Sequence, residues 1–203
     1  MDYSLYYVAD VSKVSPGKFL DVLEDALRGG VSMVQLRAKE LTWPEFLNLA
    51  AKVKKLCRKY GVPFIVNDRI DIALASNADG VHLGDSDTSV SVARKVLGKR
   101  SIIGRTVRSA DEAVRAEYEG ASYVSVGSIY PTKTKRVPKI VGPSGIGRVR
   151  QKVKIPVVAI GGIGLKNART VIRSGADGIA VVSAIAHARN PFNAASKLRK
   201  LIK

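Results

Sequence analysis

Short runs of apolar residues alternate along the chain with segments whose apolar positions recur every three to four residues. The first pattern is typical of buried strands and the second of amphipathic helices. Strands are expected at residues 5–10, 32–37, 63–68, 80–85, 101–106, 122–128, 156–162 and 178–183. Helices are expected near 16–29, 43–60, 69–76, 87–97, 109–119, 143–152, 165–174 and 187–202. These eight strand–helix pairs predict an α/β protein, a (β/α)8 TIM barrel forming a single compact domain over residues 1–203.

The even-numbered strands of this predicted barrel repeat one local pattern. The segments GVSMVQLR, NADGVHLG, GASYVSVG and GADGIAVV begin at residues 30, 77, 120 and 175. Alternate strands of a barrel share an interior layer of side chains. The repeat aligns Gln35 with His82, Ser125 and Ala180, and it aligns Arg37 with Gly84, Gly127 and Val182. We therefore expect Arg37 to point inward among small residues, which leaves space for an anion beside it.

Polar side chains gather where the predicted strands end, which is where barrels of this type carry their active sites. They include Gln35, Arg37, Lys39, Asn67, Asp68, His82, Asp87, Thr106 and Ser183. Asp68 and Asp87 follow neighbouring strands, and each could cap a helix. Together they could instead hold Mg²⁺, which binds one or two carboxylates plus substrate phosphates. His82 is either a hydrogen-bonded interior histidine or a ligand contact.

Two loop segments have the composition of phosphate-binding elements. YPTKTK, residues 130–135, stands in the longest stretch without periodicity. It is either a solvated loop or a flap that brings Thr132, Thr134 and Lys135 over a phosphate. The glycines of GGIG, residues 161–164, permit close backbone approach, and in a barrel this position predicts a monophosphate site.

The composition favours an anionic partner. The net charge is +17, from 34 Lys and Arg against 17 Asp and Glu. Aromatic residues are only 6% of the chain and do not interleave with the cations, which argues against nucleic acid. The charge then reflects either a solvated basic surface or a small anionic substrate. No apolar stretch reaches the length of a membrane span, and the first residues lack the pattern of a signal peptide. The lone Cys57 lies on an apolar helical stripe, which predicts a buried thiol and a cytoplasmic protein.

The segments VQLRAKE, FIVNDRIDIALASNADGVHLGDSD, IYPTKTK, PVVAIGGI and ADGIAVVSAI strongly resemble the thiamine phosphate synthase family, also called thiamine-phosphate pyrophosphorylase. The matches cover most of the chain, in order, and the combination of QLRxK, NDR and PTxTK is specific. The resemblance implies a (β/α)8 barrel and a magnesium-dependent transferase of thiamine biosynthesis. The reaction implied joins 4-amino-2-methylpyrimidin-5-ylmethyl diphosphate to 4-methyl-5-(2-phosphoethyl)thiazole and releases pyrophosphate.

The resemblance also implies roles for individual residues. The pyrimidine diphosphate would be bound by Gln35, Leu36, Arg37, Ala38, Lys39, Asn67, Thr106 and Lys135. Of these, Arg37, Lys39 and Lys135 would be catalytic because they stabilise the leaving pyrophosphate. Asp68 and Asp87 would hold one Mg²⁺, and the thiazole phosphate would be bound by Thr132, Lys133, Thr134, Gly162, Val182 and Ser183. The expected partners are two small phosphorylated substrates, with a possible homodimer and no nucleic acid or membrane.

Two positions depart from the family pattern, and two other functions are alternatives to the synthase. Thr106 stands where the family usually has Ser, and Arg108 takes a position where histidine is common. The related thiazole tautomerase has the same fold, but it would be expected to need that histidine and has no use for a magnesium–diphosphate set. A basic barrel that binds RNA would leave the acids and glycines at the strand ends unexplained. The synthase is therefore the preferred interpretation.

Overall fold

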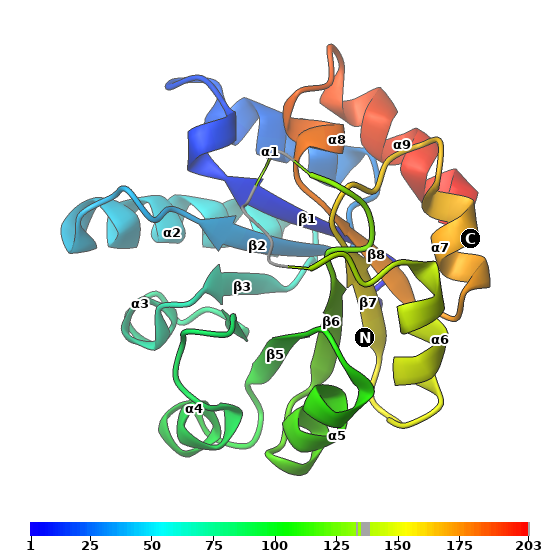
Figure 1. The fold of residues 1–203 in the computed structure, drawn as a ribbon. Helices are drawn as coiled ribbons and strands as arrows, with labels where there is room; N and C mark the ends of the chain where they lie inside the picture. The colour runs from blue at the N-terminus through cyan, green and yellow to red at the C-terminus, as the bar shows by residue number, and fades with distance from the viewer. Residues whose placement is uncertain (133, 135–138, 203) are drawn as a thin grey trace.

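In the computed structural model, eight parallel strands close into a barrel in the order of the sequence, β1 to β8, with β8 pairing back to β1 (Figure 1). The structure describes residues 1–132, 134 and 139–202. The strands are β1 Leu5–Asp10, β2 Met33–Arg37, β3 Phe64–Asn67, β4 Gly80–Leu83, β5 Ile102–Val107, β6 Tyr123–Gly127, β7 Val157–Ile160 and β8 Gly178–Val181. The predicted (β/α)8 barrel is confirmed.

The helices lie around the outside of the barrel (Figure 1). They are α1 Phe19–Arg28, α2 Trp43–Lys59, α3 Ile70–Ala75, α4 Val90–Leu97, α5 Ala110–Tyr118, α6 Pro143–Arg150, α7 Ala168–Arg173, α8 Ser183–Ala186 and α9 Pro191–Ile202, with a short 3₁₀ turn at Val11–Lys13. The prediction of one helix over 187–202 is wrong at its start. Pro191 begins α9, because proline suits a first helical position, and the preceding α8 ends at Ala186.

Local sequence explains several helix starts. The α2 helix begins after Thr42, whose backbone N–H donates to the Glu45 side chain at 2.9 Å. The α4 and α5 helices begin after Ser89 and Ser109, whose side chains accept from backbone N–H groups one turn on. These caps fix the point at which each loop after a strand becomes helix.

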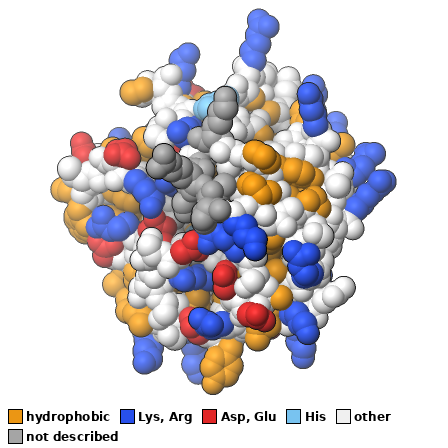
Figure 2. Space-filling view, in the orientation of Figure 1, with side chains coloured by type: hydrophobic (Ala, Val, Ile, Leu, Met, Phe, Trp, Pro, Cys, Tyr) orange, Lys and Arg blue, Asp and Glu red, His pale blue; other side chains and the backbone are white. Residues whose placement is uncertain are grey.

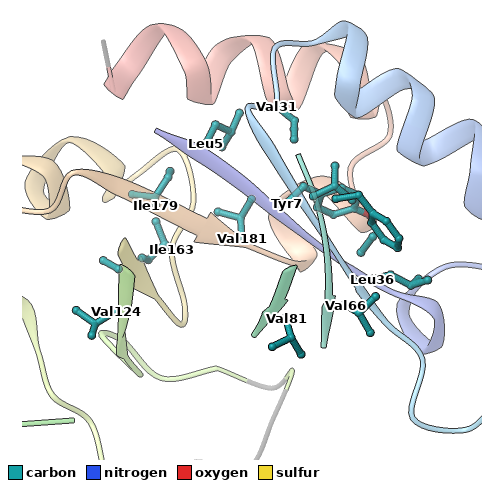
Figure 3. Packing of buried hydrophobic residues seen from close by; sticks show 14 of the residues in the cluster. Leu5, Tyr7, Val31, Leu36, Val66, Val81, Val124, Ile163, Ile179 and Val181 are labelled. Atoms are coloured by element: carbon teal, nitrogen blue, oxygen red, sulfur yellow. The ribbon is translucent and has the colours of Figure 1, made fainter. Parts of the chain in front are cut away.

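Each strand separates two cores. The larger core lies between the outward strand faces and the helices and includes Leu5, Tyr7, Leu36 and Val66 (Figure 3). A smaller one fills the barrel interior with Tyr6, Val8, Met33, Ile65, Ile102, Tyr123, Val158 and Ala180. The interior core closes the barrel at one level and leaves the carboxyl ends of the strands to line a cavity.

Cys57 is buried, and this burial raises the pKa of its thiol to about 12, as expected for a structural cysteine. Within the described part of the chain, no helix combines the length and the apolar character that crossing a bilayer requires.

Candidate active site

A cavity of about 370 Å³ opens at the carboxyl ends of the strands. The aligned layer predicted from the even strands is confirmed, because every one of its members lines this cavity. These members are Gln35, His82, Ser125, Ala180, Arg37, Gly84, Gly127 and Val182. The small residues opposite Arg37 provide the space that the alignment predicted.

Arg37 enters the cavity from the end of β2, and Asp10 at the end of β1 holds it. The Arg37 Nη1 atom lies 2.7 Å from Asp10 Oδ2, in a register that pairs the two residues directly. Asp10 is buried, and its other oxygen accepts from the backbone and hydroxyl of Ser12. A buried carboxylate with these partners fixes the guanidinium in one orientation, and its other N–H groups can donate to an anion.

A second ion pair joins the loops after β2 and β3. Lys39 Nζ lies 2.8 Å from Asp68 Oδ2, and the Asn67 side chain donates to the other Asp68 oxygen. Asp68 has a φ of +65°, which is uncommon for a residue other than glycine. It does not cap α3, whose N-cap is Arg69. A non-glycine residue in this conformation is often found at functional sites, and the turn aims the carboxylate at the cavity.

Asp87 lies on the loop after β4, next to Asp68, which follows β3. Its Oδ2 accepts from the Gly84 backbone N–H at 2.6 Å, and Ser89 rather than Asp87 caps α4. Burial raises the pKa of the Asp87 carboxyl, and hydrogen bonding and repulsion from the Asp68 carboxyl raise it further, against the opposing effects of the Gly84 N–H and the Lys39 ammonium. Two carboxylates forced together in this way are the hard oxygen donors that a divalent cation would neutralise.

A chain of hydrogen bonds crosses the floor of the cavity. Gln35 Nε2 donates to the Tyr6 hydroxyl at 2.8 Å, and the Tyr6 and Tyr123 hydroxyls lie 2.9 Å apart. His82 Nδ1 lies 2.8 Å from the Tyr123 hydroxyl, and His82 Nε2 lies 2.9 Å from Thr106 Oγ1. Burial raises the pKa of both tyrosines well above the ordinary value, so the hydroxyls stay protonated. His82 is therefore an interior histidine within hydrogen-bond distance of residues on β5 and β6.

The opposite wall of the cavity consists of small and hydroxyl-bearing residues. It includes Ser128, Thr132, Thr134, Gly161, Gly162, Val182 and Ser183. Gly162 has a φ of +65°, and a Cβ there would lie 2.6 Å from the carbonyl oxygen of Pro131. Asn167 ties this glycine loop together, because its side chain donates to the Gly162 carbonyl and accepts from the Gly164 N–H. The glycine therefore permits the close packing of two loops at this end of the cavity.

The structure brings most of the predicted site residues together. Cavity-lining residues among them are Gln35, Arg37, Lys39, Asn67, Asp68, Asp87, Thr106, Thr132, Thr134, Gly162, Val182 and Ser183. Leu36 and Ala38 are different, because their side chains are buried in the outer core and do not line the cavity. Lys133 and Lys135 lie outside the described residues.

Sequence reasoning missed several cavity residues. Asp10 ends the first strand and obeys the same strand-end rule that selected Arg37, so this signal was present. Tyr6 was hidden in the uniformly apolar run LYYVAD, in which alternation cannot be seen. Arg108 lines the cavity and pairs with Asp85, while its Nε atom has no hydrogen-bond partner among the described residues.

The fold and the cavity together define a parallel (β/α)8 barrel with paired acids and bases at the carboxyl ends of its strands, a class of barrel suited to phosphorylated small molecules. The family model described as thiamine monophosphate synthase matches residues 5–185, and the chain belongs to this family of transferases.

Similar proteins agree over nearly the whole chain. It is 47% identical to a thiamine-phosphate synthase of Methanobrevibacter smithii, over 100% of this chain and 97% of that protein. It is 45% identical to one of Clostridium acetobutylicum, over 100% of this chain and 96% of the relative. The structure of a thiamine phosphate pyrophosphorylase from Pyrococcus furiosus superposes with a TM-score of 0.90 at 39% identity, covering 99% of this chain and 96% of the other.

Proposed function

We propose that this protein is a magnesium-dependent thiamine phosphate synthase. It would transfer the 4-amino-2-methylpyrimidin-5-ylmethyl group from its diphosphate to 4-methyl-5-(2-phosphoethyl)thiazole and release pyrophosphate. The observation that carries the proposal is the division of one cavity into a charged wall, with Arg37, Lys39, Asp68 and Asp87, and a wall of small and hydroxyl-bearing residues. Such a division suits a diphosphate on one side and a second substrate on the other.

The charged wall fits a magnesium ion held mainly by substrate. Among residues 1–132, 134 and 139–202, no group of three or more His, Cys, Asp or Glu side chains is placed to bind a metal. Mg²⁺ needs only one or two protein carboxylates when phosphate oxygens and water complete its shell. Asp68 and Asp87 would hold it, and when bound it would neutralise charge on the diphosphate.

The cations of the same wall would stabilise the leaving group. When the C–O bond breaks, its electron pair leaves with pyrophosphate, and positive charge develops on the pyrimidine methylene. Arg37, already oriented by Asp10, and Lys39, held by Asp68, present fixed positive charge where negative charge grows. We assign Lys135 the same role from the sequence.

The neutral amides of Gln35 and Asn67 suit the pyrimidine ring, because they can orient it without forming a covalent bond to its cation. Both side chains are buried at the strand ends, where Gln35 bonds to Tyr6 and Asn67 to Asp68. The thiazole nitrogen then forms the new C–N bond, so no protein nucleophile is required. Holding the two substrates in contact would supply much of the rate.

The wall formed by Thr132, Thr134, Gly162, Val182 and Ser183 is assigned to the thiazole phosphate. Hydroxyl groups and exposed backbone N–H groups can donate to a monophosphate without adding net charge. Lys133 is included on the sequence pattern alone. This wall follows β6, β7 and β8, whereas the paired carboxylates follow β3 and β4, and this arrangement supports two distinct phosphate positions.

Small substrates fit the charge distribution better than nucleic acid does. Among the described residues, the cavity cations Arg37, Lys39 and Arg108 are each paired with a carboxylate. On the face shown in Figure 2, basic side chains are dispersed around the edge and also lie beside acidic side chains near the middle. We also retain a cytoplasmic location and a possible homodimer as expectations.

The proposal is tested by measuring pyrophosphate release from purified protein. Release should require both substrates and Mg²⁺, and thiamine phosphate should form in equal amount. Omitting the thiazole phosphate should abolish release, which excludes simple hydrolysis of the diphosphate. A protein that releases no pyrophosphate but isomerises a thiazole carboxylate phosphate would instead be a tautomerase, and the proposal would be wrong.

A further inference from the structure

The hydrogen-bonded chain on the cavity floor connects two residues assigned to the pyrimidine diphosphate. Gln35 and Thr106 line the cavity on β2 and β5, and Tyr6, Tyr123 and His82 join them through the barrel interior. Tyr123 has no exposed surface, and Tyr6, although it belongs to the cavity lining, is only 1% exposed and uses its hydroxyl to bond to Gln35 and Tyr123. These tyrosines therefore influence a ligand mainly through Gln35 and Thr106, the two side chains at the ends of the hydrogen-bonded network.

The strand register builds this contact. His82 pairs with Gly104, and Gly104 pairs with Tyr123, so a glycine stands between the two large side chains at one level of the barrel. A Cβ at Gly104 would lie 2.1 Å from Tyr123 Cζ and 2.5 Å from His82 Nδ1. The absence of a side chain at Gly104 allows the His82 and Tyr123 rings to stack with centroids 5.6 Å apart. It also allows His82 Nδ1 and the Tyr123 hydroxyl to form a hydrogen bond.

One assignment of donors and acceptors lets every buried N–H and O–H group of the network donate a hydrogen bond. Gln35 donates to Tyr6, so Tyr6 donates its own proton to Tyr123, and Tyr123 donates to His82 Nδ1. The His82 ring then carries its proton on Nε2 and donates to Thr106 Oγ1. Thr106 is left with its hydroxyl proton for the cavity, and Gln35 is left with its Oε1 acceptor.

We propose that Tyr6, Tyr123 and His82 are positioning residues that set which hydrogen-bonding groups meet the pyrimidine ring. This hydrogen-bonded network leaves Gln35 with an acceptor toward the cavity and Thr106 with a donor. If every hydrogen bond of the network ran in the opposite direction, Gln35 would present a donor and Thr106 an acceptor. A 4-amino group, which donates, matches the Gln35 acceptor, whereas a 4-oxo group would face it with a second acceptor. The match between Gln35 and the pyrimidine 4-amino group rests on the proposed function.

The direction of the chain can be measured without any assay of activity. The protein contains two histidines, so ¹⁵N-histidine labelling gives two sets of ring signals, and a His187→Gln variant identifies those of His82. The neutral ring with its proton on Nε2 is expected. Tyr123→Phe removes the donor to Nδ1 and should shift the signals toward a mixture of tautomers. A His82 ring protonated on Nδ1, or on both nitrogens, in the unaltered protein would overturn the proposed direction.

Tyr7 provides a matched control for the hydroxyl changes. It precedes Val8 on the same strand as Tyr6, is equally buried, and its hydroxyl has no hydrogen-bond partner among the described residues. Tyr7→Phe therefore removes the same atom from the outer core. It should leave the His82 signals unchanged.

Kinetics test the positioning role. Tyr6→Phe and Tyr123→Phe should each lower kcat/KM for the pyrimidine diphosphate roughly tenfold, with the KM for the thiazole phosphate unchanged. Their preference for the 4-amino over the 4-oxo pyrimidine diphosphate should fall by a similar factor, and Tyr7→Phe should match the unaltered protein in both. Equal preferences in all three variants would refute positioning of the ring. Absence of pyrophosphate release from the unaltered protein would instead contradict the proposed function, and the histidine signals would still decide the direction of the chain.

Discussion

The two faces of the barrel strands are equally buried but differ in what their polar atoms meet. Tyr6 and Tyr7 are neighbours on β1, each 1% exposed. The Tyr6 hydroxyl lies in the interior and bonds to Gln35 and Tyr123, whereas the Tyr7 hydroxyl faces the outer core with no partner among the described residues. Burial alone therefore does not mark a functional residue; the hydrogen-bond partners of its polar atoms do.

The same division runs along β2. Val34 and Leu36 pack outward in the main core, as does Ala38 directly after the strand, and Gln35 and Arg37 point into the cavity. One strand thus contributes to stability through one face and to the proposed chemistry through the other.

The largest effect is expected from Asp68→Asn on the inner face. The loss of one carboxylate charge beside Asp87 and Lys39 should lower kcat for pyrophosphate release roughly 10³-fold, equivalent to about 4 kcal/mol. Asparagine tolerates a positive φ, so the turn should survive. The control is Asp71→Asn, an acid that bonds to Arg69 outside the cavity. Turnover of the Asp68 variant within twofold of normal would remove this carboxylate from the mechanism.

The outer face is tested by Leu36→Ala. Leu36 has no exposed surface, and its truncation should lower the free energy of unfolding by about 3 kcal/mol, measured by urea denaturation. The kcat/KM of the folded variant should stay within a few-fold of normal. Gln35→Ala should show the reverse, with roughly 1 kcal/mol lost in stability and a larger loss in kcat/KM. Equal stability losses for the two variants would contradict the division of roles.

Gly104→Ala tests whether the inner face is closely packed around the polar chain. The added Cβ would overlap Tyr123 and His82, so the free energy of unfolding should fall by about 2 kcal/mol. Gly147→Ala, in helix α6, is the control, because its nearest contact would be an ordinary 3.5 Å. That change should raise the free energy of unfolding by up to about 1 kcal/mol. Thermal melting that leaves Gly104→Ala as stable as the unaltered protein would count against this packing.

The smallest effect is expected on the stability of the metal-free protein when Asp87 is replaced by asparagine. A carboxyl whose pKa is raised in the folded state binds its proton more tightly there than in the unfolded state. The free energy of unfolding therefore falls as the pH rises from the ordinary carboxyl pKa of 3.8 to the raised pKa of the folded state. Asp87→Asn should therefore be more stable than the unaltered protein at pH 7, and the difference should shrink toward pH 4. Urea denaturation at the two pH values checks the sign. A less stable variant at pH 7 would show that no repulsion is present.

Magnesium should change the sign of that comparison. If Asp68 and Asp87 hold the ion, adding Mg²⁺ with pyrophosphate should raise the Tm of the unaltered protein by mass action, with little effect on Asp87→Asn. Pyrophosphate without Mg²⁺ is the control. An equal rise in both proteins would place the ion elsewhere.

Much of the fold and part of the site could be predicted because the signals are local. Strand and helix periodicity gave the eight units, and the repeat in the even strands correctly placed Gln35 and Arg37 in the cavity. Other features could not be predicted in this way. The run LYYVAD is apolar throughout, so the sequence did not show that Tyr6 faces inward and Tyr7 outward. The helix expected from residue 187 begins only at Pro191, and a separate short helix, α8, ends before it at Ala186.

The sequence by itself determined the order of the elements, the polar strand ends and the inward alternation of β2, because each depends on residues only a few positions apart. The tertiary structure alone decided which of those polar groups meet. Tyr6 and Tyr123 are 117 residues apart, and Asp10 and Arg37 are 27 apart. Only closure of the barrel, with its particular strand register, brings such groups within 3 Å, and that geometry is a property of all eight strands together.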